Sequence, residues 1–397
     1  ASHLHDRKTI SIYDPTSGSG SLLLNIGRSI SKHTTTKDSV HYYAQELKSA
    51  TYNLTRMNLV MRGIKPGNID VRNADTLEED WPRDERTPAP TLYLDAVVSN
   101  PPYSQPWNPN GKDLDPRYRY GVAPKGKADY AFLLHDLYHL KPDGIMTIVL
   151  PHGVLFRGDA AKDEAEGVIR KNLIENNHLD AVIGLPADIF FGTGIATIIL
   201  VLCQKRDRDD VLFIDASKGF IKSGKKNKLR ASDIRRIVDT YEERLDIDKF
   251  SRRVSREEIR ENGYNLNIPR YVDSSDAAET WDLYATMYGA IPNREIDSLP
   301  YWSYLPTLRN SLFEPINDTH CRHRLENGTR KLIETDQSYH QLTQAYDQTM
   351  SDLVQFLDKE LLQSVQTVPV NSEEEVISEE LFSRLGKHPI FNPYDVY

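Results

Sequence analysis

The segment from Leu92 to Ser104, LYLDAVVSNPPYS, decides how this chain is interpreted. Its first half is an apolar run typical of a buried strand, and the tetrapeptide Asn100-Pro101-Pro102-Tyr103 ends that strand. Proline removes a ladder donor and keeps the residue before it extended, so the tetrapeptide forms a stiff turn. The turn presents an amide, main-chain carbonyls and an aromatic ring beyond the end of a strand, where ligands bind in open α/β sheets. By itself, such a tetrapeptide is more often a plain strand terminator, so its meaning depends on the rest of the chain.

Strand-like runs alternate with helical patterns on both sides of this segment. Such runs are found at residues 9–14, 40–46, 69–76, 144–150, 179–185, 196–203 and 211–216. Strands that alternate with helices form βαβ units, so the pattern predicts a doubly wound α/β fold. Several of these runs are fully apolar, which indicates a sheet that is covered on both faces.

Polar residues stand at the carboxyl ends of the first three runs. Asp14 ends the first run and precedes a glycine turn, with Gly18 and Gly20, that opens a helix from about Ser21 to Ser31. The second run ends at Glu46, the position where an acid binds ribose hydroxyls in dinucleotide folds. The third ends at Asp75. Because parallel strands end at one edge of a sheet, we expect these residues to meet the Asn-Pro-Pro-Tyr turn in one crevice.

Composition sets broad limits on the class of protein. A chain of 397 residues is too long for one ordinary core, so two domains are expected. Its two cysteines, Cys203 and Cys321, lie far apart and offer neither a disulfide framework nor metal-ligand spacing, so we expect no metal site and a cytoplasmic location. No apolar run is long enough for a membrane span. The first residue is Ala1 and a strand follows almost at once, so we expect further sequence upstream.

Charge is unevenly distributed along the chain. The net charge of −9 argues against a protein that coats nucleic acid by itself. Between Lys218 and Arg236, however, there are eight basic residues. A local basic strip in an acidic protein can bind phosphates, but it is equally compatible with a solvated loop and helix.

The sequence divides into three parts. We expect a catalytic domain over residues 1–216, or as far as residue 272, then a basic helical extension over 217–272 and a helical C-terminal region over 273–397. Within the C-terminal region a heptad-like seam runs through Tyr339, Leu342, Tyr346, Met350, Leu353 and Leu357. A helix of this chain or of a partner protein would cover that seam, and the sequence leaves both open.

The motifs, taken in order, resemble a known family. YDPTSGSGSLLL at 13–24, KGKADYAFLLH at 125–135, GLPADIFFGTGIATIILVL at 184–202 and VLFIDAS at 211–217 join the Asn-Pro-Pro-Tyr turn. Together they resemble the S-adenosylmethionine-dependent enzymes that methylate adenine in DNA, and more closely the modification subunits of type I restriction–modification systems. The resemblance covers about residues 8–272. Asn-Pro-Pro-Tyr alone would not be specific, because glutamine-methylating and guanine-N2-methylating enzymes carry similar tetrads.

The resemblance implies a mostly parallel, seven-stranded, Rossmann-like sheet and methyl transfer to N6 of a flipped adenine. The implied partners are double-stranded DNA, a separate specificity subunit, a second modification subunit and a restriction subunit. Members of the family have a helical N-terminal domain and an upstream aromatic motif, and neither precedes Ala1 here. Position 17 is serine where members often have alanine or cysteine, with no expected consequence.

The resemblance also implies a set of residues that bind S-adenosylmethionine: Asp14, Thr16, Ser17, Gly18, Gly20, Ser21, Glu46, Asp75, Thr76 and Asn100. The glycine turn would place backbone amides near the methionine carboxylate. Glu46 would hold the ribose hydroxyls, and Asp75 would accept a hydrogen bond from the amine of the cofactor's adenine.

The catalytic residues implied are Asn100, Pro101 and Tyr103. The side chain of Asn100 and the carbonyl of Pro101 would accept hydrogen bonds from the target amine, and Tyr103 would stack on the base. The base pocket would be completed by Pro102 and Phe191, and DNA would be bound by Lys225, Lys226 and Lys228. Asp129 and Tyr130 are expected in the pocket wall without an assigned chemical role.

Other functions remain possible from the sequence alone. The chain could be a self-sufficient adenine DNA methyltransferase, or an RNA or protein-glutamine N-methyltransferase. A non-catalytic scaffold would have no need of Asp75, Asn100 and Tyr103 together. A nicotinamide-dependent dehydrogenase would share the glycine turn and the acid but would leave the Asn-Pro-Pro-Tyr turn without a role.

Overall fold

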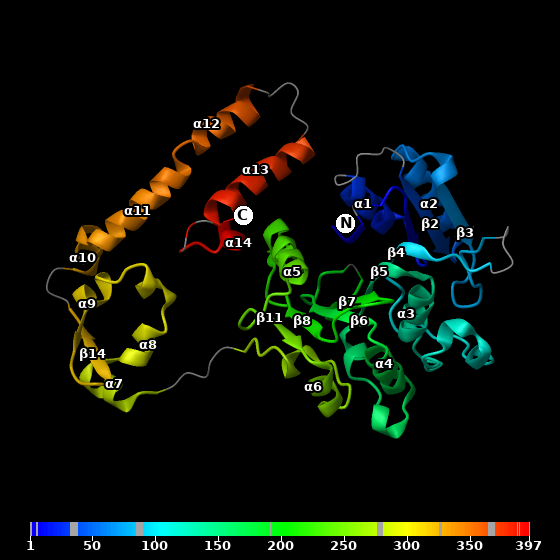
Figure 1. Cartoon of the computed structure of the whole chain (residues 1–397), viewed down its shortest axis with the longest axis horizontal. Coiled ribbons are helices and arrows are strands. Elements are labelled where there is room, and N and C mark those ends of the chain that lie inside the picture. Colours follow the sequence, from blue (N-terminus) through cyan, green and yellow to red (C-terminus); the bar gives the residue numbers. More distant parts are fainter. Residues whose placement is uncertain are drawn as a thin grey trace. The chain divides into compact units, whose positions relative to one another are not determined.

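The computed structural model describes residues 2–4, 7–31, 39–84, 90–190, 192–275, 281–324, 328–363, 370–386, 388 and 390–396 (Figure 1). The chain forms two compact units, Ala1–Ser275 and Asp276–Tyr397. Among the described residues, no helix is both long enough and apolar enough to cross a membrane.

The first unit is built on one sheet with the strand order β11-β8-β6-β7-β5-β4-β1-β2-β3. The strands are β1 Ile10–Asp14, β2 Val40–Glu46, β3 Ile69–Asn73, β4 Leu94–Ser99, β5 Leu140–Pro151, β6 Leu179–Gly184, β7 Thr197–Cys203, β8 Val211–Asp215 and β11 Ser251–Val254. Strands β1 to β5 are parallel to one another, and β8 is parallel to β6. Strands β7 and β11 run antiparallel to their neighbours. The predicted doubly wound, mostly parallel sheet is confirmed.

The expected count of seven strands is too small, because the sheet continues past β6 through β8 and β11. The run that forms β8 was visible in the sequence, whereas β11 was not. Arg252 and Arg253 at the centre of β11 are exposed, and only Ser251 and Val254 are buried. A four-residue edge strand with two central arginines carries no apolar alternation.

Helices cover both faces of this sheet (Figure 1). One face packs on α1 (Ser21–Ser31), α2 (Ser49–Met61) and α5 (Ala231–Glu243), and the other on α3 (Asp129–Tyr138), α4 (Ala165–Glu175) and α6 (Arg256–Glu261). Successive strand residues enter opposite layers. Ile12 lies in the core under α1 and α2, whereas Tyr13 lies in the core under α3. The fully apolar strands are thus explained by burial on both faces.

Helix α2 does not bury the apolar side chains that its sequence places on one face. Its apolar positions Leu54, Met57 and Val60 share one face, but all three side chains are exposed. The helix is held to the sheet through Thr55 and Leu59, which are fully buried.

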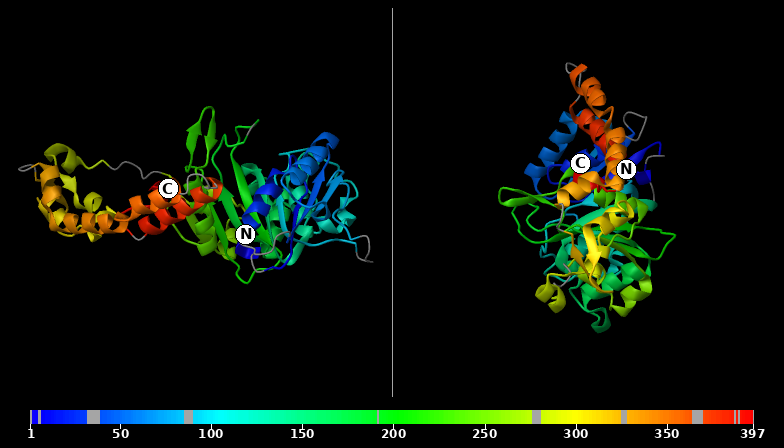
Figure 2. Two further views of the ribbon diagram at one scale, coloured as in Figure 1. Left: turned by 90° about the horizontal axis from the view of Figure 1, so that it is seen from above. Right: turned by 90° about the vertical axis from the view of Figure 1, so that its left-hand side faces the viewer.

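The basic extension is not wholly helical. It begins with a hairpin of two short strands, β9 (Ile221–Ser223) and β10 (Lys226–Lys228), and continues into α5. The hairpin projects from the unit in the left view of Figure 2. Gly224, with a φ of +62°, lies in its turn, where glycine adopts a positive φ without steric cost.

The second unit combines helices with a small sheet. Its elements are α7 Leu283–Tyr288, β12 Ile291–Pro292, α8 Asn293–Asp297, α9 Leu308–Leu312, β13 Phe313–Pro315, β14 His320–His323, α10 Thr329–Thr335, α11 Gln337–Met350, α12 Leu353–Leu357, a π-helix Asp358–Gln363, α13 Val370–Leu385 and α14 Pro393–Val396. The three-stranded sheet, β12-β14-β13, was not expected from the sequence. Short 3-10 helices in both units are Ser2–Leu4, Pro66–Asn68, Lys112–Leu114, Pro116–Tyr118, His152–Leu155, Ala160–Lys162, Ile268–Arg270 and Pro300–Ser303.

The heptad-like seam is divided rather than continuous. Asp336 separates α10 from α11 and caps α11, and a turn at 351–352 separates α11 from α12. Tyr339 and Leu342 pack on a cluster formed by Leu305, Leu308 and Leu312. Tyr346 contacts the rings of His388 and Phe391. The first half of the seam therefore packs in part within this chain, with Tyr346 still 37% exposed.

A buried charged cluster fastens the added strand β8 and helix α5 to β6. The carboxylate of Asp180 on β6 accepts hydrogen bonds from Arg206 Nε at 2.8 Å, Arg244 Nη1 at 3.1 Å and the Tyr241 hydroxyl at 2.6 Å. Arg244 also pairs with Asp210, immediately before β8, at 3.2 Å. Asp180, Arg206 and Arg244 are all nearly inaccessible to solvent.

Replacement of Asp180 by alanine should destabilise the first unit strongly. Asp180→Ala leaves two buried guanidinium groups without their common partner, which typically costs about 3–5 kcal/mol. Urea denaturation followed by circular dichroism measures this loss. Lys162→Ala, which removes an exposed ion pair with Asp159, is the control and should change stability by less than about 1 kcal/mol. Equal effects of the two substitutions would contradict the role given to the cluster.

Candidate active site

The carboxyl ends of four parallel strands meet at one edge of the sheet. In the strand register Asp14 lies beside Ala44, Glu46 lies beside Asn73, and β1 pairs with both β2 and β4. The direction of winding changes between β1 and β4, because the chain runs outward from β1 through β2 to β3 before it returns. Open α/β sheets form their ligand crevice at such a point.

A cavity of about 420 Å³ lies in this crevice. It is lined by Pro15, Thr16, Glu46, Leu47, Lys48, Thr51, Asp75, Thr76, Asn100, Pro102, Gln105 and Phe132. The structure thus brings together residues predicted from three strand ends and from the Asn-Pro-Pro-Tyr turn. The other six lining residues were not predicted, because nothing in their local sequence separates them from ordinary core or loop residues; they are Pro15, Leu47, Lys48, Thr51, Gln105 and Phe132.

The side chain of Glu46 binds the backbone of the turn after β1. The amide of Gly18 donates to Glu46 Oε2 at 3.0 Å, and the amide of Lys48 donates to Glu46 Oε1 at 2.9 Å. Gly20 has a φ of +79°, and a Cβ there would approach Thr55 Cγ2 to 3.2 Å. Glycine is therefore required at position 20 by both the backbone and the close helix.

The other predicted residues of this turn lie around the cavity rather than on its wall. The amide of Ser17 donates to the carbonyl of Gln45 at 3.0 Å, so this serine fastens the turn to β2. Ser21 begins α1, and its hydroxyl lies 2.6 Å from that of Ser19. Ser21 lines a different cavity, on the side of α1 that faces Tyr42. The structure does not bring Ser21 to the wall of the predicted cofactor cavity.

The turn after β3 is clamped by the long segment 104–127. Asp75 Oδ1 accepts from the amide of Leu77 at 3.0 Å, which shapes the turn. Arg117, which is buried, donates to the carbonyls of Thr76 at 2.9 Å and Leu77 at 3.3 Å. Lys112 Nζ also donates to the carbonyl of Leu77, at 2.8 Å. Segment 104–127 therefore fixes the backbone beside Asp75.

A chain of hydrogen bonds continues from Arg117 into the core. Arg117 Nη1 lies 3.1 Å from His135 Nδ1, and His135 Nε2 lies 2.9 Å from the hydroxyl of Tyr13. Because a guanidinium can only donate, Nδ1 accepts and the imidazole proton is on Nε2. Burial, His139 and Arg117 hold the pKa of His135 well below its usual value, which agrees with a neutral ring.

The Asn-Pro-Pro-Tyr turn is held on both sides by carboxylates of α3. Before the turn, the Ser99 hydroxyl donates to Asp136 Oδ2. After the turn, the amide of Ser104 donates to Asp129 Oδ1 at 2.7 Å. Asp129 is in turn paired with Arg157 at 2.5 Å. Asp129 therefore stabilises the backbone after the turn, a role that could not be predicted from its sequence position. Asp136 was not singled out in the sequence.

Within the turn, the hydroxyl of Tyr103 donates to Asn100 Oδ1 at 2.8 Å. Burial raises the pKa of Tyr103 to about 12, so the hydroxyl keeps its proton and acts as a donor. The ring of Tyr103 meets that of Phe190 edge to face, with centroids 6.5 Å apart and planes at 74°. Phe191, the residue predicted for this position, lies outside the described residues. Phe190 is the neighbouring aromatic residue that faces the turn.

The three predicted DNA-binding lysines have different environments. Lys225 and Lys228 are exposed, whereas Lys226 is half-buried. Its ammonium donates to the carbonyls of Phe190 at 2.7 Å and Thr193 at 2.9 Å. Lys226 is thus engaged by the protein itself.

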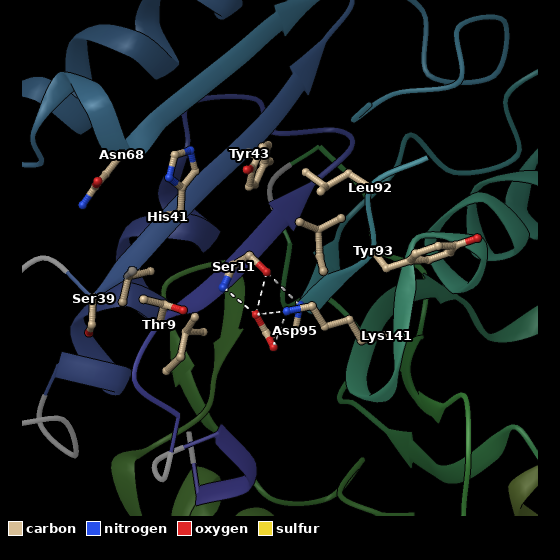
Figure 3. Close-up of a pocket in the computed structure, with 13 residues that line it drawn as sticks. Thr9, Ser11, Ser39, His41, Tyr43, Asn68, Leu92, Tyr93, Asp95 and Lys141 are labelled. Atoms are coloured by element: carbon tan, nitrogen blue, oxygen red, sulfur yellow. Dashed lines mark hydrogen bonds and ion pairs between the residues drawn. The ribbon is translucent and has the colours of Figure 1, made fainter. Parts of the chain in front are cut away.

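A second cavity, of about 360 Å³, lies at the opposite edge of the sheet (Figure 3). There the carboxylate of Asp95 accepts from Ser11 at 2.6 Å and from Lys141 at 2.9 Å. The cavity is formed at the amino ends of β1, β2 and β4, and it shares no lining residue with the crevice. It is therefore separate from the predicted site.

The sequence model of the family described as N-6 DNA Methylase matches residues 1–280. The chain belongs to this family. The resemblance found in the sequence is confirmed.

Relatives of known name agree with this membership. The chain is 39% identical over 279 residues to the type I restriction enzyme MpnII methylase subunit of Mycoplasma pneumoniae, covering 68% of this chain and 50% of the relative. It is 32% identical over 278 residues to the HindI methylase subunit of Haemophilus influenzae, covering 67% and 59%. The crystal structure of a type I restriction-modification methyltransferase subunit from Streptococcus thermophilus superposes with a TM-score of 0.63 at 50% identity, covering 68% of this chain and 55% of that one. The chain spans about half the length of the curated relatives it matches.

In this member of the N-6 DNA Methylase family, Asp14 should make stability depend on pH. Burial, with a smaller contribution from Glu46, raises the pKa of Asp14 to about 7, against hydrogen bonds from Thr16 that lower it. The folded chain then binds a proton that the unfolded chain releases near pH 4. The associated stability is present below pH 4 and is lost as the pH rises to 7, by up to about 4 kcal/mol.

The substitution Asp14→Asn removes this titration and keeps the shape of the side chain. Urea denaturation at intervals from pH 4 to pH 8 should show wild-type stability falling relative to that of the variant across this window. Burial and, to a smaller extent, the charge of Asp14 raise the pKa of Asp136, so part of the difference between the two profiles comes from Asp136. Parallel pH profiles would mean that Asp14 titrates as an ordinary exposed carboxyl.

Proposed function

We propose that this chain is the catalytic part of a type I modification subunit, which transfers a methyl group from S-adenosylmethionine to N6 of adenine in DNA. One observation carries the proposal. Asn100 of the Asn-Pro-Pro-Tyr turn lines the same cavity as Glu46 and Asp75. An acceptor for an amine and a pocket with acceptors for a nucleoside therefore share one crevice. Membership of the N-6 DNA Methylase family supports this assignment.

The cavity fits the cofactor in chemistry. Its wall combines the carboxylates of Glu46 and Asp75 with the apolar groups of Leu47, Pro15 and Phe132. Carboxylates suit hydroxyl and amine donors as well as a positive charge, and the apolar groups suit a purine ring. Glu46 would hold ribose hydroxyls, Asp75 would accept from the adenine amine, and the turn at Gly18 and Gly20 would face the methionine carboxylate. When bound, S-adenosylmethionine supplies a methyl group on a positively charged sulfur.

Asn100 and Pro101 act on the target amine. The exocyclic amine of adenine is a weak nucleophile because its lone pair is delocalised into the ring. Two acceptors, the Asn100 side chain and the Pro101 carbonyl, would localise that pair on nitrogen, and they gain most when the nitrogen becomes tetrahedral. The nitrogen gains the methyl group and gives up one proton to solvent. The hydroxyl of Tyr103 keeps the amide oxygen of Asn100 oriented, and that oxygen retains a second lone pair for the amine.

The target base reaches this site only outside the DNA stack. Flipping costs roughly a few kcal/mol, which stacking and hydrogen bonds in the pocket offset. Tyr103 and Phe190 provide two aromatic rings beside Asn100 and Pro102, the residues that face the cavity. The exposed Lys225 and Lys228 would bind DNA phosphates nearby.

The substitution Asn100→Ala tests this assignment directly. Loss of an acceptor that acts in the transition state should lower turnover by at least about a hundredfold, with cofactor affinity kept. Turnover is measured as labelled methyl transfer to adenine in genomic DNA, with and without the specificity subunit, and affinity by calorimetry. Asn110→Ala, which changes an exposed asparagine in the segment after the turn, is the control and should behave like wild type. Wild-type turnover in Asn100→Ala would remove the proposed mechanism.

The name of the relatives, methylase subunit, implies that they act as parts of a larger enzyme. By analogy we propose that this protein works in the cytoplasm with double-stranded DNA, a specificity subunit, a second modification subunit and a restriction subunit. The second half of the seam is the candidate docking surface. On α12, Val354 is 76% exposed, and Leu353 beside it is half-buried.

The substitution Leu353→Asp should weaken association with the specificity subunit. A charge at the apolar face of α12 would be desolvated in the complex without a partner. Gel filtration of the mixed subunits measures the association, with Gln355→Asp, at an exposed polar position of the same helix, as the control. Unchanged complex formation would make α12 an internal helix rather than a docking surface.

A further inference from the structure

The β9–β10 hairpin rests on the connection between β6 and β7. Asn227 of the hairpin is buried, and its side-chain amide donates to the carbonyl of Ala187 at 2.7 Å. Its backbone amide donates to the carbonyl of Asp188 at 3.0 Å. Lys226 adds two bonds further along, to the carbonyls of Phe190 and Thr193. Four hydrogen bonds thus join two neighbouring hairpin residues to four carbonyls of one connection.

These bonds are suited to holding a backbone in place. Two of them come from an ammonium group, and charge-assisted hydrogen bonds are about twice as strong as neutral ones. The connection itself has neither helix nor strand between residues 185 and 196 where it is described. Asp188 adopts a φ of +56°, in the left-handed region that aspartate enters more readily than most side chains, and its carbonyl is held there by Asn227. The hairpin therefore supports this part of the connection.

The connection carries the aromatic side chain that faces the Asn-Pro-Pro-Tyr turn. The carbonyl bound by Lys226 belongs to Phe190, the residue whose ring meets that of Tyr103. Phe190 is therefore the single residue that links Lys226 to Tyr103 of the Asn-Pro-Pro-Tyr turn. Lys225, its neighbour in the sequence, is exposed in contrast.

We propose that the hairpin is a brace for the target-base pocket, with Lys226 and Asn227 as positioning residues that hold Phe190 opposite Tyr103. The inference rests on the function proposed above and adds to it. It separates the three lysines predicted to bind DNA into one that shapes the pocket, Lys226, and two that face DNA, Lys225 and Lys228. One small element then combines phosphate binding on its exposed side with support of the pocket on its inner side.

Hydrogen–deuterium exchange of the chain alone tests the brace. The substitution Lys226→Met keeps the aliphatic stem and removes the donor. The amide of Asn227, which donates to the carbonyl of Asp188, should then exchange about ten to a hundred times faster. Lys226→Arg, which can donate to two carbonyls, should restore slow exchange. Lys205→Met, at an exposed lysine near the far end of β7, controls for the loss of one charge. Unchanged exchange in Lys226→Met would overturn the brace, and Asn227→Ala provides a second test with the same expected result.

Methyl transfer to genomic DNA tests the positioning. Lys226→Met should lower kcat by about tenfold or more, with the KM for S-adenosylmethionine unchanged. It should also leave the salt dependence of DNA binding unchanged, whereas Lys225→Met should reduce the slope by about one phosphate contact. A reduced salt slope in Lys226→Met would make this lysine a DNA ligand and overturn the proposal. Fast exchange with wild-type kcat would overturn the positioning role.

The two proposals fail in different ways. If the wild-type chain transfers no methyl group to adenine even with its partner subunit, the proposed function is wrong. The exchange measurement needs neither DNA nor cofactor, so it still decides whether the hairpin holds the connection.

Discussion

The crevice depends on one carboxylate that receives two backbone amides. Glu46 ends β2, and through Gly18 and Lys48 it joins the turn after β1 to the start of α2. Hydrogen bonds from amides to a carboxylate are strong and directional, so this single side chain sets the shape of the cavity wall between the turn after β1 and the start of α2. Because β1 lies between β2 and β4 in the sheet, that wall is also fixed relative to the strand that carries Asn100.

The two sides of the crevice are linked, because the segment that follows the Asn-Pro-Pro-Tyr turn on one side binds the backbone beside Asp75 on the other. The segment that follows the Asn-Pro-Pro-Tyr turn contains Arg117, which binds the carbonyls of Thr76 and Leu77 beside Asp75. Rearrangement of this segment would therefore disturb both the turn that carries Asn100 and the cavity. A long connection without regular periodicity can be tolerated here because its buried guanidinium satisfies backbone groups that would otherwise lack partners.

Much of this arrangement could be predicted from the sequence, for a simple reason. Asp14, Glu46, Asp75 and Asn100 each follow an apolar run, and parallel strands bring such positions to one edge. Edge strand β11 could not be recognised, since its central arginines face solvent. Asp136 and Arg117 were not singled out, and Asp129 was given no role, because the groups of the two turns that they bind are distant in sequence.

The adjacent residues Lys225 and Lys226 show most clearly what cannot be predicted from the sequence. Lys225 and Lys226 are the same residue in nearly the same local sequence, yet one is exposed and the other binds two carbonyls 33 and 36 positions away. Only tertiary structure separates them. For the same reason the sequence did not single out Phe190, whose ring meets that of Tyr103, because a run of two phenylalanines carries no signal of direction.

Helix α3 carries both carboxylates that hold the Asn-Pro-Pro-Tyr turn. Asp129 and Asp136 are seven residues apart, which is two helical turns, so they project from the same side of the helix. One binds the residue before the turn and the other binds the residue after it. The turn and helix α3 therefore form one structural unit, in which the shape of the turn depends on two side chains of the helix. A recombinant between two relatives would keep a correctly shaped turn when both pieces come from one parent, and a crossover between residues 104 and 129 would separate the turn from its support.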